Sequence, residues 1–464
     1  MTGLALAGCG AGGADAGNGE EVVEITLSGP NQWNNNPSSF GPAWEDMVAR
    51  FEEAEPNIKV KTTVLPIPTF AQTLSTQLTA GTAPELVFNQ APHSPDQVVN
   101  LDEYMAAPSP YSDADTWLDS FDQKYFGTGN AGSKNAAGNY EWAPLNLVII
   151  GVYYNEEIFE EAGVTAPIET MDDMMDACVA IKDAGYTPFA MDNGWLGQGW
   201  TLSTIESMLV DKYADELNQF APDGSPGTSP QVSGKSISKA VLTGELSPLE
   251  TPEIAESLKI TKDFFDACAT PNWSGIQGGA AFIGNDEWLS GKAAMSYGTN
   301  FAANNLEDVD WAYGTMPFPT ITDETTSLSD NTPARFGAAP GGTSYMIPAT
   351  TEGAKLEAAV KFLQFVTSAE GNQEWMNNSG GIPATVDGEP APGLEGLMSG
   401  EWFNSPTIPA LTLTPKAKAG QALYTGYLLG DKSLEDQLVE MQEDWTQASQ
   451  EQAADGGWTE DWAQ

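Results

Sequence analysis

Side chains able to catalyse a reaction are scarce in this chain of 464 residues. His93 is the single histidine, so a Ser-His-Asp triad would depend on it alone, and no Gly-x-Ser-x-Gly motif accompanies it. A zinc site with more than one histidine is impossible, and the three cysteines are too widely separated for a zinc knuckle. We therefore expect neither a metal ion nor a cofactor.

Three other patterns resemble reactive motifs. Gly234-Lys235-Ser236 looks like the end of a phosphate loop, but Ser229 stands where that motif requires glycine. Four aspartates between residues 113 and 122 lack the glycine and the spacing of a calcium loop, which favours a solvated acidic face. Some pair among the 65 acidic residues would always suit a glycosidase, and the sequence gives no means of choosing one. A secreted glycoside-active enzyme stays open as an alternative.

Aromatic and amide side chains are the stronger signal, because they gather at predicted strand ends and in glycine-rich loops. A pyranose ring packs its C–H face on a flat aromatic ring, and its hydroxyl rim needs neutral donors and acceptors in the same plane. The aromatic candidates are Trp33, Trp142, Trp195, Trp200, Phe301 and Tyr345. The amide candidates are Gln32, Asn34, Asn89, Gln90, Asn146 and Asn300. For each tryptophan, the alternative is an ordinary place in the core.

The charge balance restricts the ligand further. The formal net charge is −47, from 65 acidic and 18 basic residues. Nucleic acid and anionic membranes are bound through Lys and Arg patches, so this balance argues against both partners. It also disfavours a polyanionic ligand, and a neutral ligand fits best. No run of eighteen apolar residues occurs that could span a membrane.

The elements that must position these residues begin with an alternating pattern. A chain of this length needs two or more lobes. The first elements predicted are strands at 22–28, 57–64 and 85–89, separated by helices at 38–53 and 69–79. This order predicts a parallel sheet with helices on both faces, the α/β class. The loops at the carboxyl ends of such strands, here 29–37 and 89–93, face a crevice where ligands bind.

The stretch Tyr140–Gly163 is the predicted crossing between lobes. Val148–Tyr154 is a continuous apolar run, typical of a strand buried on both faces. Asn155 is suited to cap the helix that follows, and Gly163 to end it. In period-2 terms Trp142 and Asn146 share a face, so both could look into one cleft.

Further elements follow the crossing. Helices are predicted at 169–184, 201–218, 252–269, 279–290, 355–367, 371–377, 416–428 and 433–450, and strands at 292–297, 310–316 and 336–348. Trp195 and Trp200 are expected in the glycine-rich loop 191–200. Cys178 and Cys268 lie in similar helical contexts, and an exported chain permits either a disulfide or two buried free thiols.

The N-terminus suggests an anchor. Leu4–Ala7 is a short apolar stretch without a preceding basic region, as at the end of a cut signal peptide. Leu6-Ala7-Gly8-Cys9 is similar to the bacterial lipobox, in which the cysteine thiol is acylated. Residues 1–20 would then be a lipobox remnant and a flexible tether.

Several segments together resemble one family, the family 1 extracellular solute-binding proteins of bacterial ABC importers, which are maltose-binding-protein-like. Their order and spacing hold over nearly the whole chain. The segments are FEEAEPNIKV (Phe51–Val60), AGTAPE (Ala80–Glu85), YNEEIFEEAG (Tyr154–Gly163), GKAAM (Gly291–Met295) and the run from Gly341 to Pro383.

The resemblance implies a type II periplasmic-binding-protein-like fold with two hinged α/β lobes and a sugar in the cleft. Lobe 1 would comprise 21–148 and 337–372, and lobe 2 would comprise 149–336 and 373–464. It implies site loops at Gln32–Asn34 and Asn89-Gln90, and adds Gly341 and Gly342 beside Tyr345. The expected protein is a lipid-anchored, extracytoplasmic monomer that captures a neutral oligosaccharide by lobe closure and passes it, unaltered, to the permease subunits. A binder of a non-sugar solute in the same fold is the further alternative.

Overall fold

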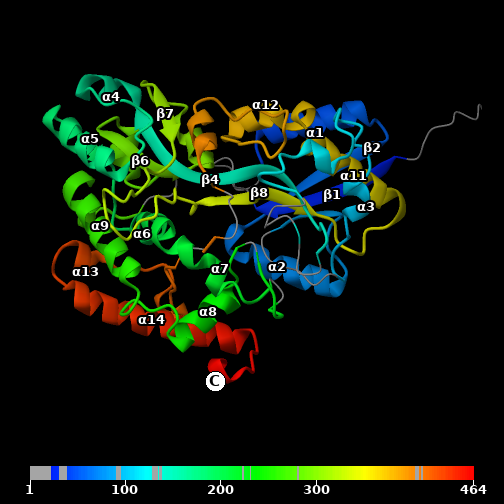
Figure 1. The fold of residues 1–464 in the computed structure, drawn as a ribbon. Helices are drawn as coiled ribbons and strands as arrows, with labels where there is room; N and C mark the ends of the chain where they lie inside the picture. The colour runs from blue at the N-terminus through cyan, green and yellow to red at the C-terminus, as the bar shows by residue number, and fades with distance from the viewer. Residues whose placement is uncertain are drawn as a thin grey trace, which may run out of the picture.

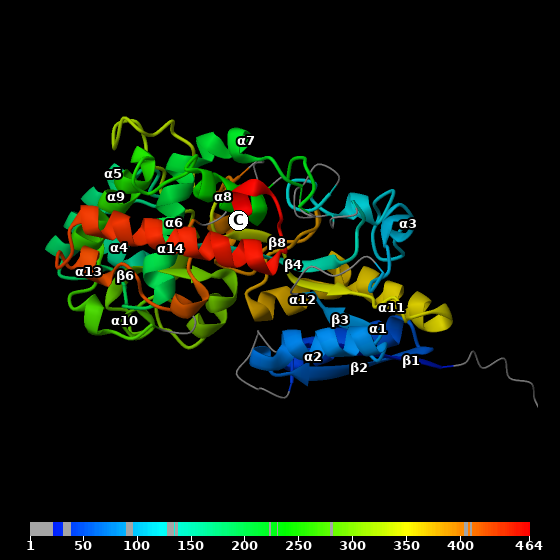
Figure 2. The same cartoon turned by 90° about the horizontal axis from the view of Figure 1, so that it is seen from below.

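Two α/β bodies lie side by side in the computed structural model, and the long strands β4 and β8 pass between them (Figure 1). The structure describes residues 22–30, 39–89, 96–127, 134, 138–221, 224–229, 231–278, 282–402, 407–408 and 411–464. Seen from below, α8 and α14 belong to the body opposite the one that holds α1, α2, β1 and β2 (Figure 2). We call the body with β1 the first lobe and the other the second lobe.

A single mixed sheet runs through both lobes in the described part of the chain. Its order is β2-β1-β3-β8-β4-β6-β5, and β7 pairs beside β4. The strands are β1 Val23–Pro30, β2 Ile58–Leu65, β3 Leu86–Phe88, β4 Ala143–Asn155, β5 Thr187–Phe189, β6 Ala293–Thr299, β7 Tyr313–Met316 and β8 Ala338–Met346.

Helices cover this sheet. They are α1 Pro42–Ala54, α2 Ile67–Ala80, α3 Asp102–Met105, α4 Glu156–Ala162, α5 Met171–Asp183, α6 Trp195–Val210, α7 Ala214–Leu217, α8 Gly234–Thr243, α9 Pro252–Cys268, α10 Asn285–Leu289, α11 Gly353–Val366, α12 Ala369–Ser379, α13 Thr425–Leu428 and α14 Leu434–Asp455. The predicted helix at 416–428 is wrong, because only a 3-10 turn at Lys416–Lys418 and the short α13 form there. The predicted helix at 279–290 shortens to α10.

The first lobe confirms the predicted β-α-β-α-β order. β1 pairs in parallel with both β2 and β3, so it lies at the centre of their three-stranded part. Trp44, Met47 and Phe51 form the buried stripe of α1, and the Phe51 ring meets the Phe362 ring of α11 at 5.0 Å. Each such burial stabilises the lobe by about 1.5–3 kcal/mol relative to an exposed side chain.

β4 is shared by the two lobes. Its first part pairs antiparallel with β8 as far as Ile149, and its second part pairs with β6 from Ile150 onwards. The predicted strand at 148–154 is therefore confirmed but too short, since β4 begins at Ala143. Pro144 has no N–H to donate, and the register shifts between Pro144 and Asn146, as at a bulge.

The end of β4 behaves as predicted. The Asn155 side-chain oxygen accepts from the backbone N–H groups of Glu157 at 3.0 Å and Ile158 at 3.1 Å, which caps α4. Gly163 ends that helix with a left-handed φ of 69°.

The second lobe contains one clear departure from the prediction. Trp195 and Trp200 lie in α6, which begins at Trp195, and not in a loop. Gly197 and Gly199 lower the helix propensity of this turn, which hides the helix in the sequence. At the first of them packing is tight, because a Cβ on Gly197 would come within 3.2 Å of the Asp192 carbonyl oxygen.

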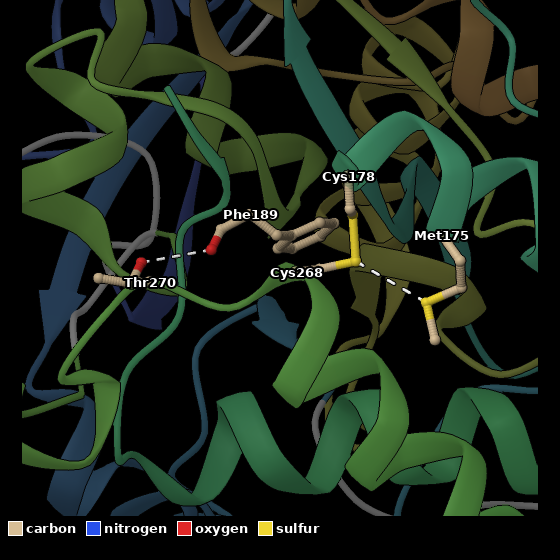
Figure 3. The surroundings of a disulfide bond; sticks show 5 residues. All are labelled: Met175, Cys178, Phe189, Cys268 and Thr270. Atoms are coloured by element: carbon tan, nitrogen blue, oxygen red, sulfur yellow. Dashed lines mark hydrogen bonds between the residues drawn. A yellow bond between two sulfur atoms is a disulfide. The ribbon is translucent and has the colours of Figure 1, made fainter. Parts of the chain in front are cut away.

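Cys178 of α5 and Cys268 of α9 form a disulfide, with a Cα–Cα distance of 5.3 Å (Figure 3). Beyond Cys268 the chain joins the sheet, because the Thr270 N–H donates to the Phe189 carbonyl of β5 at 3.0 Å. The bond therefore lies inside the core of the second lobe and links two of its helices.

The Glu206 carboxyl group of α6 is buried without a hydrogen-bond partner among the described residues. It is 1% exposed, and neither carboxylate oxygen has a hydrogen-bond partner within the described residues. Burial raises its pKa from 4.5 to about 8. The side chain is accordingly protonated at neutral pH in the folded protein.

Removing the disulfide should destabilise the protein. The bond closes a chain separation of 90 residues, so a Cys178→Ala/Cys268→Ala variant should lose about 2–4 kcal/mol of unfolding free energy. Urea denaturation monitored by circular dichroism measures this difference. An unchanged urea midpoint would show that the bond contributes nothing to stability.

Glu206→Gln should stabilise the protein by an amount that depends on pH. The unfolded carboxyl ionises near pH 4.5 and the folded one near 8, so the wild type loses stability as pH rises between these values. The gain should therefore grow from pH 4.5 to about 8, towards the order of 5 kcal/mol. Thermal melts across this range test it. The control is Glu253→Gln, which should destabilise because Glu253 pairs with Lys212 at 2.8 Å.

Candidate functional site

A groove of about 590 Å³ lies where the start of α1, the end of α12 and the 3-10 segment η4 (Asn300–Leu306) meet. η4 directly follows β6 of the second lobe, whereas α1 belongs to the first lobe. We call this cavity the α1–η4 groove. Its volume is within the roughly 300–1,000 Å³ usual for small-molecule sites.

The aromatic part of the groove comes from three elements. Phe40 precedes α1, Phe301 belongs to η4, and Trp375 belongs to α12. Phe40 and Trp375 are 3% and 1% exposed, so they form its floor, and Phe301 is only partly buried. Phe40 packs edge-on against Trp44 at 5.1 Å, which fixes the floor to the core of the first lobe.

The rim of the groove is polar. Amides are supplied by Asn304, Asn305 and Asn378, and carboxylates by Asp46, Glu307 and Glu374. No Lys or Arg is among the described residues that line it. Amides and carboxylates accept from hydroxyl groups and amides also donate to them, so this rim suits a polyhydroxylated ligand.

The start of α1 is held in place by local hydrogen bonds. The Gly41 N–H donates to the Ser39 hydroxyl oxygen at 3.0 Å, and Gly41 adopts φ 90°, which favours glycine. Pro42 then opens the helix at a position where its missing N–H costs nothing. Arg50 pairs with Asp46 at 3.2 Å, so one carboxylate of the rim is already neutralised.

Of the predicted site residues in the described part of the chain, Phe301 is the one that lines this groove. Four others, Gln32, Trp33, Asn34 and Gln90, lie outside the described residues. Asn89 directly follows β3, and its N–H donates to the Ser344 carbonyl at 2.9 Å. Gly341 and Gly342 are part of β8.

Trp142, Asn146 and Tyr345 lie inside the first lobe and do not line the groove. Trp142 is 9% exposed and packs against Phe126 at 5.2 Å, while Asn146 and Tyr345 are fully buried. The Asn146 side-chain oxygen accepts from the Thr343 N–H at 2.9 Å. Burial raises the pKa of Tyr345 well above its usual value. The β4–β8 region is covered on both faces, and period-2 spacing alone could not reveal this.

Trp195 and Trp200 start a helix whose first turn is braced by side chains. The Gln198 amide donates to the side-chain oxygens of Asn193 and Thr425, each at 2.8 Å. Trp195 is 53% exposed, whereas Trp200 is partly buried and packs against Tyr297 at 6.1 Å. Neither residue lines the α1–η4 groove.

Asn300 is fully buried, and its carboxamide bonds to the backbone of other segments rather than facing the groove. Sequence reasoning missed Phe40, which the helical period placed in the core. It also missed Asn304 and Asn305, although this amide pair directly follows Phe301-Ala302-Ala303 and was a usable signal.

The described residues contain no group of three or more His, Cys, Asp and Glu residues arranged to hold a metal ion. They also contain no helix with the length and apolarity needed to cross a membrane.

Comparisons with known proteins match this architecture. The chain is 24% identical to the multiple sugar-binding protein of Streptococcus mutans over 388 residues, which covers 82% of this chain and 79% of the relative. It is 22% identical to the sn-glycerol-3-phosphate-binding periplasmic protein UgpB of Escherichia coli, with 80% and 76% covered. The fold is similar to that of apo RafE from Streptococcus pneumoniae, with a TM-score of 0.62 at 18% identity, over 93% of this chain and all of that one.

The sequence profile of one family accounts for most of the chain. It matches residues 34–373, which include the whole of α1, β4, η4 and β8. The protein therefore belongs to the bacterial extracellular solute-binding protein family.

Proposed function

We propose that this protein captures a neutral oligosaccharide outside the cytoplasm and delivers it to the permease of an ABC importer. The observation that carries the proposal is the α1–η4 groove, in which aromatic rings and amides from both lobes meet in a member of a solute-binding family. Ring faces and uncharged hydrogen-bonding groups are what a pyranose requires.

The names of the two relatives indicate two kinds of solute, a sugar and a phosphate ester. A phosphate is normally held by Arg, Lys or a helix N-terminus. The groove is lined by no basic side chain among the described residues. The nearby Arg50 guanidinium is engaged by Asp46 and by the backbone carbonyls of Glu370 and Gly371. These contacts favour the sugar.

The sequence of the two predicted site loops supports an uncharged ligand. Segments 29–37 (GPNQWNNNP) and 89–93 (NQAPH) contain no Asp, Glu, Lys or Arg, although 18% of the chain is charged. The first of these segments connects β1 to the residues that open α1 and line the groove. Structures with this fold include RafE in complex with raffinose and a Bacillus licheniformis sugar transporter with stachyose.

Binding is coupled to movement of the lobes in this proposal. A ligand that touches both lobes only when they are closed shifts the population towards the closed state. In this proposal, one crossing between the lobes lies where β4 exchanges partners, at Ile149–Ile150. The division proposed at residue 372 falls inside α12, which packs on α1 and α11, so we place that crossing after Ser379.

The remaining parts of the proposal rest on sequence. Cys9, which follows Leu6-Ala7-Gly8, would carry a lipid that holds a monomeric receptor at the outer face of the cytoplasmic membrane. No chemistry would be done on the ligand, as fits a family of binding proteins. Hydrolysis of oligosaccharides by the purified protein would instead support a glycosidase.

A solute screen by isothermal titration calorimetry tests the ligand class. Raffinose and stachyose should bind with heat changes, and sn-glycerol 3-phosphate should not, because no described residue that lines the groove carries a positive charge. Tight binding of the phosphate ester alone would overturn the proposal. The same titrations at high and low salt serve as the control, since binding of a neutral ligand should be nearly independent of salt.

Phe301→Ala should weaken sugar binding by ~1–3 kcal/mol, the usual effect of truncating an anchoring aromatic side chain. Calorimetry with the tightest-binding sugar of the screen measures the loss. Trp458→Ala is a matched control, because Trp458 is another partly buried aromatic residue but packs near the C-terminus against Trp462. Equal affinities for Phe301→Ala and the wild type would remove the groove from the binding site.

A further inference from the structure

Asn300 occupies the point where β6 of the second lobe ends and η4 begins. Its neighbour in the chain, Phe301, lines the α1–η4 groove, but Asn300 itself is 0% exposed. A buried carboxamide is costly unless its donors and acceptor are used, so its partners indicate what it does.

The carboxamide of Asn300 connects to two segments that are distant in the sequence. Its oxygen accepts from the Ile149 N–H at 3.0 Å, and its NH₂ group donates to the Leu147 carbonyl at 3.3 Å. The same NH₂ group donates to the Gly380 carbonyl at 2.8 Å. Leu147 and Ile149 lie near the end of the part of β4 that pairs with β8. From Ile150 onwards the strand pairs with β6.

Gly380 is the contact of Asn300 that comes from the first lobe. It follows α12, whose helix packs on α1, and its left-handed φ of 65° turns the chain towards Asn300. A Cβ on Gly380 would lie 2.4 Å from the Asn300 carbonyl oxygen, so the two backbones approach more closely than another residue allows. Two residues further on, the Ile382 carbonyl accepts from the Leu147 N–H at 2.8 Å. Three crossing segments therefore meet around one side chain.

We propose that Asn300 is a positioning residue that clamps β6, β4 and the segment after α12 together and so sets how the two lobes are oriented. The inference rests on the proposed function, because lobe orientation matters for a receptor that closes on its ligand. The clamp also fixes the start of η4, and with it the place of Phe301 in the groove. Replacement of Asn300 should loosen the hinge before any ligand is present.

The test measures the distance between the lobes in the absence of ligand. Spin labels on cysteines at Glu53 of α1 and Glu160 of α4, both exposed, report this distance by double electron–electron resonance in a Cys9→Ser background. Asn300→Leu, of similar volume, should shift or broaden the distance distribution. A folded Asn300→Leu protein with the wild-type distribution would overturn the proposal.

Asn372→Leu is the matched control. Asn372 is also buried, and its amide donates to the carbonyls of Leu145 in β4 and Val366 in α11 at 3.2 and 2.8 Å. Its bonds stay within the first lobe, so its loss should lower the melting temperature and leave the distance distribution unchanged. If Asn300→Leu does not fold, Gly380→Ala disturbs the same contact from the other side. A folded Gly380→Ala protein with the wild-type distribution would then overturn the proposal.

Sugar-binding measurements on the same variants distinguish a failure of this proposal from a failure of the proposed function. With raffinose or stachyose added, Asn300→Leu should bind at least tenfold more weakly than the wild type, and Asn372→Leu should bind normally. If neither sugar binds the wild type, the proposed ligand class fails, while the ligand-free distributions still decide whether Asn300 acts as a clamp.

Discussion

The exchange of partners along β4 is the constraint on which the rest of the structure depends. The first part of β4 forms backbone hydrogen bonds with β8, and its second part forms them with β6. Because backbone hydrogen bonds must be kept on both sides, the two lobes are continuous through the sheet yet have separate helical layers. Other crossing segments also meet beside Ile149, through the Asn300 carboxamide.

The candidate site shows how a very acidic protein can present a ligand surface without basic residues. The groove takes its rings from the segment before α1, from η4 and from α12, and its rim carries amides together with carboxylates. Sugar hydroxyls donate readily to carboxylates, so negative charge at the rim does not exclude a neutral ligand. In the proposed receptor, the same carboxylates would disfavour anionic competitors by charge repulsion.

Local patterns predicted much of the fold. The first-lobe strands, the Asn155 cap and the Gly163 stop were visible because each depends on neighbouring residues. The start of α6 and the bulge at Pro144 were missed, because tertiary packing overrode weak propensity there. Of the groove, only Phe301 was found. Phe40 and Asn304 are more than 250 residues apart, and nothing local in either segment indicates that they meet.

The disulfide between α5 and α9 joins two helices of the same lobe. Both cysteines lie in the core of the second lobe, so the bond would not restrain the lobe closure proposed above. In the proposed receptor, oxidants or reductants would thus alter how long the protein survives, and not which solute it accepts. Expression in a reducing cytoplasm should accordingly yield a receptor that recognises its cargo but is degraded sooner.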